Sequence, residues 1–115
     1  GPQSAELTML IDDMEKTETA TGDGPVDATF NAVKALHPHS ARLQLYQVHA
    51  VTEGTDAQAT VSVRMEEEGN IATGQSADTD TVVASAKAYV NALNRLLVRR
   101  GRTGEDTKEI NYKYL

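Results

Sequence analysis

Two stretches of the chain alternate apolar and polar residues, which is the pattern of a strand with one buried face. In residues 5–11 and again in residues 59–66, every odd position is apolar and most positions between are polar. Turn-forming acidic residues follow each stretch, and the polar residues 15–21 and the segment that begins at Ile71 predict return strands. The pattern therefore predicts two β-hairpins.

A helix is predicted after the first hairpin. Pro25 suits the first turn of a helix, where a missing N–H costs nothing. Val26, Phe30 and Val33 then recur at the spacing of one helical face, with Leu36 near the same face. A proline at position 38 ends the segment, because the residue before a proline avoids the helical region.

A longer helix is predicted over residues 81–99, with N-cap candidates at positions 78–80. Its apolar residues form two adjacent stripes, Val83, Ala86, Val90, Leu93 and Leu97 in one and Val82, Tyr89 and Leu96 in the other. Two stripes are more than one sheet face needs. We therefore expect this helix to contact a second helix or another subunit.

Residues 43–51 predict one more strand, whose alternation slips between Leu45 and Tyr46 and so indicates a bulge or burial on both faces. The polar residues 101–108 predict a mobile tail, and residues 109–115 fit either a short strand or disorder. Gly1-Pro2 looks like a protease-cleavage scar. We therefore expect residues 3–100 to form one domain and residues 101–115 a C-terminal tail.

The two halves of the chain look alike, which indicates a duplicated unit. Residues 58–63 are similar to residues 4–9, and an offset of 57 pairs apolar positions of the two helices. The strand and helix matches differ by a few positions, so we interpret the repeat as similarity with insertions. The second half has an extra leading strand, whose counterpart would lie before Gln3. The first sheet should then have a bare edge or take a strand from elsewhere, for example from residues 109–115.

Composition excludes several classes of protein. The chain has 115 residues and 39% hydrophobic residues, enough for one folded domain. Its net charge of −6 and its single Phe disfavour a nucleic-acid binder. It has no cysteine, no long apolar run and no signal-peptide pattern, so we expect a cytoplasmic protein that does not enter membranes. No nucleophile–base pair or metal cluster is visible, so no catalytic or metal-binding residue is predicted.

Gly22-Asp23-Gly24-Pro25 is the main candidate for chemistry. Two glycines permit positive φ and close approach of a ligand to the backbone. The helix N-terminus that follows offers unpaired N–H groups and a positive dipole end, which suit a carboxylate. From composition alone, an ordinary strand-to-helix turn explains the same residues. His37-Pro38-His39 has the spacing of some metal ligands but is interpreted as a surface loop.

Three segments in this order resemble the C-terminal regulatory domain of the 2-isopropylmalate synthase family. They are Gly22-Asp23-Gly24-Pro25-Val26-Asp27-Ala28, then Gly54-Thr55-Asp56-Ala57-Gln58-Ala59, then the stretch from Ala77 to Tyr89 that runs on through residues 91–96. The resemblance covers about residues 5–97. It implies an α+β fold of two pseudo-twofold-related β-β-β-α units with helices packed on antiparallel sheets. The first unit would lack its first strand.

The resemblance also implies a function. Such a domain forms a homodimer and binds leucine as the end-product effector. A catalytic barrel of the same polypeptide condenses acetyl-CoA with 2-oxoisovalerate on a divalent metal. This fragment would then be no enzyme by itself and would hold no cofactor. Citramalate synthase carries a similar domain that senses isoleucine, homocitrate synthases are more distant candidates, and a purely structural dimerisation module is a further alternative.

The repeat places the two helix starts at equivalent positions, where both could flank one ligand. Leucine would then lie between the two units or between subunits. The N–H groups near Gly22 and Gly24 would take the carboxylate of leucine, and Asp27 or a loop carbonyl its ammonium group. An apolar lining would take the isobutyl group. The full set of expected effector-binding residues is Gly22, Gly24, Val26, Asp27, Leu43, Tyr46, Ala50, Ala57, Ala77 and Thr79.

Overall fold

A computed structural model describes residues 3–11, 13–51, 57–101 and 110–113, and the expected scar at residues 1–2 lies outside these ranges. Two hairpin–helix units follow one another along the chain. The elements are β1 (Gln3–Ile11), β2 (Met14–Gly22), α1 (Pro25–Leu36), β3 (Arg42–Val51), β4 (Gln58–Glu67), β5 (Asn70–Asp78), α2 (Thr81–Gly101) and β6 (Ile110–Lys113). These bounds confirm the predicted strands and helices to within a few residues.

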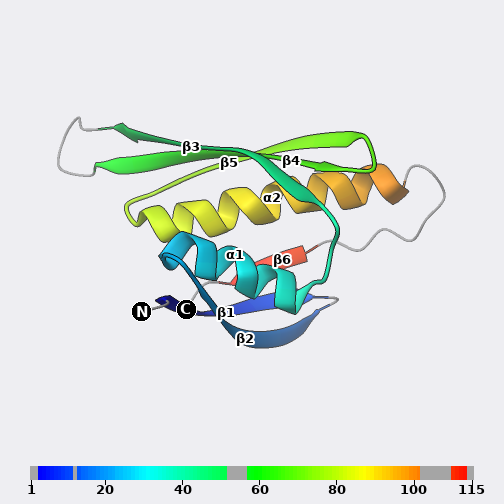
Figure 1. Cartoon of the computed structure of the whole chain (residues 1–115), viewed down its shortest axis with the longest axis horizontal. Coiled ribbons are helices and arrows are strands. Elements are labelled where there is room, and N and C mark those ends of the chain that lie inside the picture. Colours follow the sequence, from blue (N-terminus) through cyan, green and yellow to red (C-terminus); the bar gives the residue numbers. More distant parts are fainter. Residues whose placement is uncertain (1–2, 12, 52–56, 102–109, 114–115) are drawn as a thin grey trace.

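The strands form two antiparallel sheets, in the orders β2-β1-β6 and β3-β4-β5. Figure 1 shows the two helices between the sheets, α1 next to β1 and β2, and α2 below β4 and β5. Each helix thus covers the inner face of its own sheet, and the two helices pack against each other. The expected α+β fold with helices on antiparallel sheets is confirmed.

The core is continuous from one sheet to the other. Leu7 and Met9 of β1 and Val61, Val63 and Met65 of β4 have exposed fractions of 1% or less. Helix residues fill the space between these strands and belong to the same cluster: Phe30, Val33 and Leu36 from α1, and Tyr89, Val90, Leu93 and Leu96 from α2. The strict alternation that predicted β1 and β4 therefore marks the two central, most buried strands.

The internal repeat is more regular than the sequence indicated. The hairpin pairs are Gln3 with Gly22 in the first unit and Ala59 with Asp78 in the second, so one offset of 56 residues maps one hairpin onto the other. The same offset relates the starts of α1 and α2. The expected insertions and the offset of 57 are therefore wrong. At this offset Phe30 aligns with Ala86 and Val33 with Tyr89, and these unlike pairs made a shifted match look better in sequence.

The third strand of the first sheet comes from the far end of the chain. Ile110–Lys113 pairs antiparallel with Thr8–Ile11, on the side of β1 away from β2. This is the place that β3 occupies beside β4 in the second unit. The prediction that the first sheet takes a strand from residues 109–115 is confirmed for residues 110–113.

The bulge predicted in β3 is also present, but it lies between Leu43 and Leu45 and not between Leu45 and Tyr46.

Candidate functional site

The two helices begin at the same end of the molecule, as Figure 1 shows at its left side. An open pocket of about 350 Å³ lies between these helix starts and the beginning of β1. Its lining residues are Ser4, Ala5, Glu6, Pro25, Thr29, Asp80 and Val82. The volume lies in the lower part of the range for small-molecule sites, about 300–1,000 Å³. The expected convergence of two helix N-termini is therefore present.

The start of α2 is capped by the side chain of Asp80, the residue just before the helix. Asp80 Oδ1 accepts hydrogen bonds from the N–H groups of Val82 at 2.8 Å and Val83 at 3.3 Å. Asp78 supports this turn, since it accepts a hydrogen bond from the Asp80 N–H and forms an ion pair with Lys87. These two contacts, the backbone one first, lower the pKa of Asp78. The N-terminal N–H groups of α2 therefore already have a negatively charged partner.

The start of α1 has no such partner. Among the described residues no side chain caps it, and Gly24 stands at its N-cap position. The Ala28 N–H bonds to the Gly24 carbonyl, but the N–H groups of Val26 and Asp27 have no acceptor in that part of the chain. Two donors and the positive end of the helix dipole therefore remain available for an anion.

The two glycines of the turn have different roles from those expected. Gly24 has φ −153° and ψ 175°, an extended conformation open to any residue, and a Cβ there would meet no atom within 4 Å. Gly22 also lacks a positive φ, but a Cβ on it would lie 2.5 Å from the Ala28 nitrogen. Neither glycine therefore uses the positive φ that its residue type permits. Gly22 is required by close packing on α1, and Gly24 leaves space in front of the helix start.

The structure places several expected effector residues around these helix starts. Gly22 and Gly24 form the turn before α1, and Asp27 accepts a hydrogen bond from the Asp23 N–H at 2.9 Å. Thr79 lies in the equivalent turn before α2. Val26 is half-buried and packs against the core. None of these residues lines the 350 Å³ pocket itself, although Pro25 and Asp80, their immediate neighbours, do.

Tyr46 and Ala77 reach the same end of the molecule from the second sheet. The Tyr46 hydroxyl lies 2.7 Å from Ser85 Oγ, which donates its own proton to the Thr81 carbonyl. Tyr46 must therefore be the donor in this pair. Ala77 and Ala57 are exposed near the paired ends of β4 and β5, and the side chain of Ala50 lies outside the described part of the structure.

Leu43 lies apart from Ala50, although it lines the same pocket as Asp27. Seven positions separate it from Ala50 along β3, about 23 Å of extended chain. It lines a second open pocket, of about 360 Å³, between α1 and the start of β3. The residues of this pocket are Asp27, Phe30, Asn31, Lys34, Ala41, Arg42, Leu43 and Tyr89. One leucine molecule in one chain cannot contact Leu43 and the far end of β3 together.

Beside this second pocket, His39 connects the segment after α1 with α2 through a hydrogen bond to Tyr89. His39 Nδ1 accepts a hydrogen bond from the Ala41 N–H at 3.1 Å, so its Nε2 carries the proton and donates to the Tyr89 hydroxyl at 3.0 Å. Burial, aided by the nearby charge of Lys34, lowers the pKa of His39 to about 4. Burial also raises the pKa of Tyr89 to about 12. Both groups are therefore neutral at physiological pH.

Sequence reasoning missed most of the residues that line the 350 Å³ pocket. Ser4, Ala5 and Glu6 were interpreted only as strand residues, and Asp80 only as a helix cap. The signal that could have found Asp80 is the repeat itself, because the correct offset of 56 places Asp80 opposite Gly24. Ser4–Glu6 offered no local signal, since only the tertiary structure brings the beginning of β1 beside the two helix starts.

Two further observations concern other kinds of site. Within the described ranges, no group of three His, Cys, Asp or Glu side chains could hold a metal ion. In the same ranges, neither α1 nor α2 has the length and apolar character that crossing a membrane requires.

Known proteins resemble the chain over nearly all of its length. Residues 1–97 match the sequence profile of the LeuA allosteric (dimerisation) domain. The chain is 67% identical over 101 residues to a 2-isopropylmalate synthase of Caulobacter sp. (strain K31), which covers 88% of this chain and 19% of that protein. A 2-isopropylmalate synthase of Rhodopseudomonas palustris (strain BisA53) is 59% identical over 102 residues, covering 89% of this chain and 20% of that protein. The chain thus spans about a fifth of the length of these relatives, and it belongs to the LeuA allosteric (dimerisation) domain family.

Proposed function

We propose that the chain is the leucine-sensing regulatory module of a 2-isopropylmalate synthase. It acts as a homodimer, attached to a catalytic barrel that condenses acetyl-CoA with 2-oxoisovalerate. The family is described as allosteric and dimerising, and the relatives carry the name of this enzyme. Any divalent metal for the condensation would belong to the barrel. Leucine, the end product, would bind this module and inhibit the barrel.

The observation that carries the proposal is the uncapped start of α1. The N–H groups of Val26 and Asp27 have no acceptor among the described residues, and a Cβ on Gly24 would meet no atom within 4 Å. The carboxylate of leucine would accept both hydrogen bonds at the positive end of the helix dipole. A hydrogen bond to a charged group contributes about 1.5–3 kcal/mol. This is the function that Asp80 already performs for α2.

The remaining groups of leucine also find partners beside the two helix starts. Asp80 and Glu6 line the pocket, and their carboxylates would accept hydrogen bonds from the ammonium group. Ala5 and Val82 provide apolar surface for the isobutyl group. Burying such a side chain contributes about 1.5–3 kcal/mol. Because micromolar affinity requires about −8 kcal/mol, the charged ends of leucine must supply most of the binding free energy.

Calorimetric titration of this chain with leucine, isoleucine and valine tests the proposal. We expect leucine to bind most tightly, with a micromolar dissociation constant. Tighter binding of isoleucine would assign the module to an enzyme of the citramalate synthase type. A folded dimer that binds none of the three amino acids would be a structural dimerisation module, and the proposal would be wrong.

The Gly24→Val variant tests whether the carboxylate of leucine binds at the start of α1. A side chain at this position fills the space that the carboxylate needs, so the affinity for leucine should fall at least tenfold. The fold should remain, because Gly24 has an ordinary extended conformation and a Cβ there meets nothing. Ala35→Val adds similar bulk at an exposed position near the other end of α1 and is the matched control. In the full enzyme, Gly24→Val should leave turnover intact and remove inhibition by leucine.

A further inference from the structure

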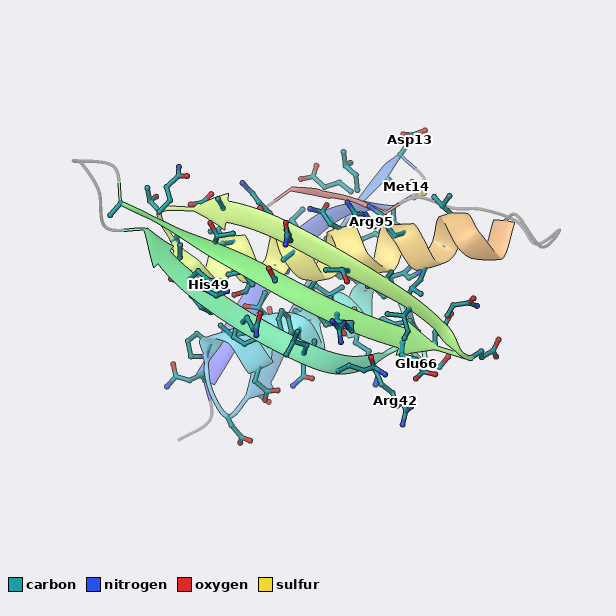
Figure 2. All side chains as sticks on the ribbon, turned by 90° about the horizontal axis from the view of Figure 1, so that it is seen from above. Asp13, Met14, Arg42, His49, Glu66 and Arg95 are labelled. Atoms are coloured by element: carbon teal, nitrogen blue, oxygen red, sulfur yellow. The ribbon has the colours of Figure 1, made fainter. Side chains whose placement is uncertain are left out.

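The outer edges of β2 and β5 are obstructed by side chains from the adjacent helices. Asn91 donates a hydrogen bond to the Gln75 carbonyl of β5 at 3.0 Å, and Arg95 donates to the Thr73 carbonyl. Figure 2 shows Arg95 beside this edge of the sheet. On β2, Asn31 donates to the Thr21 carbonyl at 2.9 Å. A second strand could pair with β5 at Thr73 and Gln75, or with the end of β2 at Thr21, only by displacing these contacts.

Among the described residues, no side chain obstructs the outer edge of β3 in this way. This strand has ten residues, and its one partner within the described residues is β4. No charged residue and no proline occurs from Leu43 to Val51, whereas β2 carries Glu15, Lys16 and Glu18. Charged residues and prolines are the usual means of blocking an edge strand. The chain has a net charge of −6, so two copies repel each other least along an edge without carboxylates. The long outer edge of β3 is therefore suited to pairing.

Apolar side chains are also left uncovered on β3. Leu43 and Val48 are 45% and 43% exposed. They pair with Met65 and Val61, which are fully buried, so they lie on the face of the sheet that looks toward the helices. The 360 Å³ pocket between α1 and β3 begins at Leu43. A partner that reaches the edge of β3 would therefore also cover apolar surface on its inner face.

We propose that two copies of this chain join by antiparallel pairing of β3 with the β3 of the second copy. This inference rests on the proposed dimer and names its surface. A second copy is the fitting occupant because the family is a dimerisation domain, and because two identical uncharged edges pair about a twofold axis without bringing like charges together. The bulge between Leu43 and Leu45 interrupts the ladder, so the pairing runs over Leu45–Val51. The two β3-β4-β5 sheets then form one continuous sheet.

Cysteine cross-linking tests this register directly. The chain has no cysteine, so one introduced thiol is the only one present. In an antiparallel homodimer the residue nearest the twofold axis lies opposite its own copy, close enough for a disulfide. We expect mild oxidation to give a disulfide-linked dimer with one of Q47C, V48C and H49C. Figure 2 shows His49 toward one end of β3, and Arg42 with its partner Glu66 toward the other.

Thr73→Cys and Gln75→Cys are the matched controls, since both positions are exposed on the other edge strand of the same sheet. They should stay uncrosslinked. Rapid cross-linking at either control position, or at Ser4 or Glu6 changed to cysteine, would overturn the proposal. So would a chain that sediments as a dimer but gives no disulfide at residues 47–49. A chain that sediments only as a monomer would also overturn it.

A charge placed on the edge gives a second test that needs no oxidation. Gln47→Lys should raise the dimer dissociation constant at least tenfold, whereas Gln75→Lys on the opposite edge should leave it unchanged. Both side chains are exposed, so neither variant should unfold the chain. Equal effects of the two variants would contradict the proposal. Leucine titration distinguishes the failure of the proposed function from the failure of the proposed interface. A chain that binds leucine but cross-links at other positions would refute only the β3–β3 interface.

Discussion

The two halves of the molecule repeat the same framework and differ at the helix start. In both, the first helical hydrogen bond comes from an alanine N–H, to Gly24 at 2.9 Å and to Asp80 at 3.0 Å. In both, a buried hydroxyl one turn later, on Thr29 or Ser85, donates to the carbonyl four residues before it at 2.7 Å. Only α2 has a carboxylate at its N-cap. The difference teaches that a duplicated unit can keep its framework while only one copy caps its helix with a carboxylate.

The halves also differ in how their sheets are completed. β4 is flanked by β3 and β5, which both lie close to it in sequence. β1 is flanked by β2 and by β6, and β6 pairs only with Thr8–Ile11. Closing a loop of about a hundred residues costs more entropy than closing a hairpin. The third strand of the first sheet is therefore held by fewer paired residues than the third strand of the second sheet.

The largest difference in stability is expected from adding a methyl group at a glycine of each half. A Cβ on Gly74 of β5 would overlap the Ala88 carbonyl oxygen and lie 2.6 Å from the Ala92 nitrogen, both on the α2 backbone. We expect Gly74→Ala to lower the free energy of unfolding by about 3 kcal/mol or more, and Gly22→Ala, at the end of β2, by about 1–2 kcal/mol. Urea denaturation measures both. A larger effect at Gly22 would show that the first half is the more tightly packed one.

Acid should weaken the contact between the halves. His39 is neutral in the folded chain because its pKa is about 4, whereas an unperturbed histidine has a pKa of 6.5. Because the unfolded state binds the proton more readily, stability is intact above pH 6.5 and falls as the pH drops from 6.5 to about 4. Since the ring is only partly buried, screening reduces the loss to about 1–2 kcal/mol. Thermal unfolding of wild type and His39→Gln across this range measures it. A wild-type profile no steeper than that of the variant would contradict the assignment.

The smallest effects should come from exchanging the helix caps. Asp80→Ala removes the cap of α2 and should cost about 1 kcal/mol of stability with no new cavity. Gly24→Ser gives α1 a cap of its own and should raise stability by a few tenths of a kcal/mol. The same serine would occupy the donors meant for leucine, so calorimetry should show weaker leucine binding. A Gly24→Ser variant that binds leucine as tightly as wild type would place the carboxylate elsewhere.

Local patterns determined nearly all the elements. Alternation fixed the inner faces of β1 and β4, the positions of Pro25 and Pro38 bounded α1, and the two stripes on α2 predicted that it packs on more than a sheet. The residues of the effector site were harder to predict. Gly24 and Asp27 stand out through the turn that contains them, but their roles as ligand contacts remain a prediction. Ser4 and Glu6 carry no local signal, because alternation identifies which face a strand residue is on and not what lies above it.

By itself, the sequence determined the repeat, the fold class and the family of this chain, since each rests on spacing along the chain. Only the tertiary structure decided the offset of 56, the conformation of Gly24, and which helix start lacks a cap. It also decided that residues 110–113 complete the first sheet and that, among the described residues, no helix side chain obstructs the outer edge of β3 as Asn91 and Arg95 obstruct that of β5. The physical reason is that hydrophobic periodicity reports which face is buried, whereas caps, strand partners and blocked edges depend on hydrogen bonds between residues far apart in the chain.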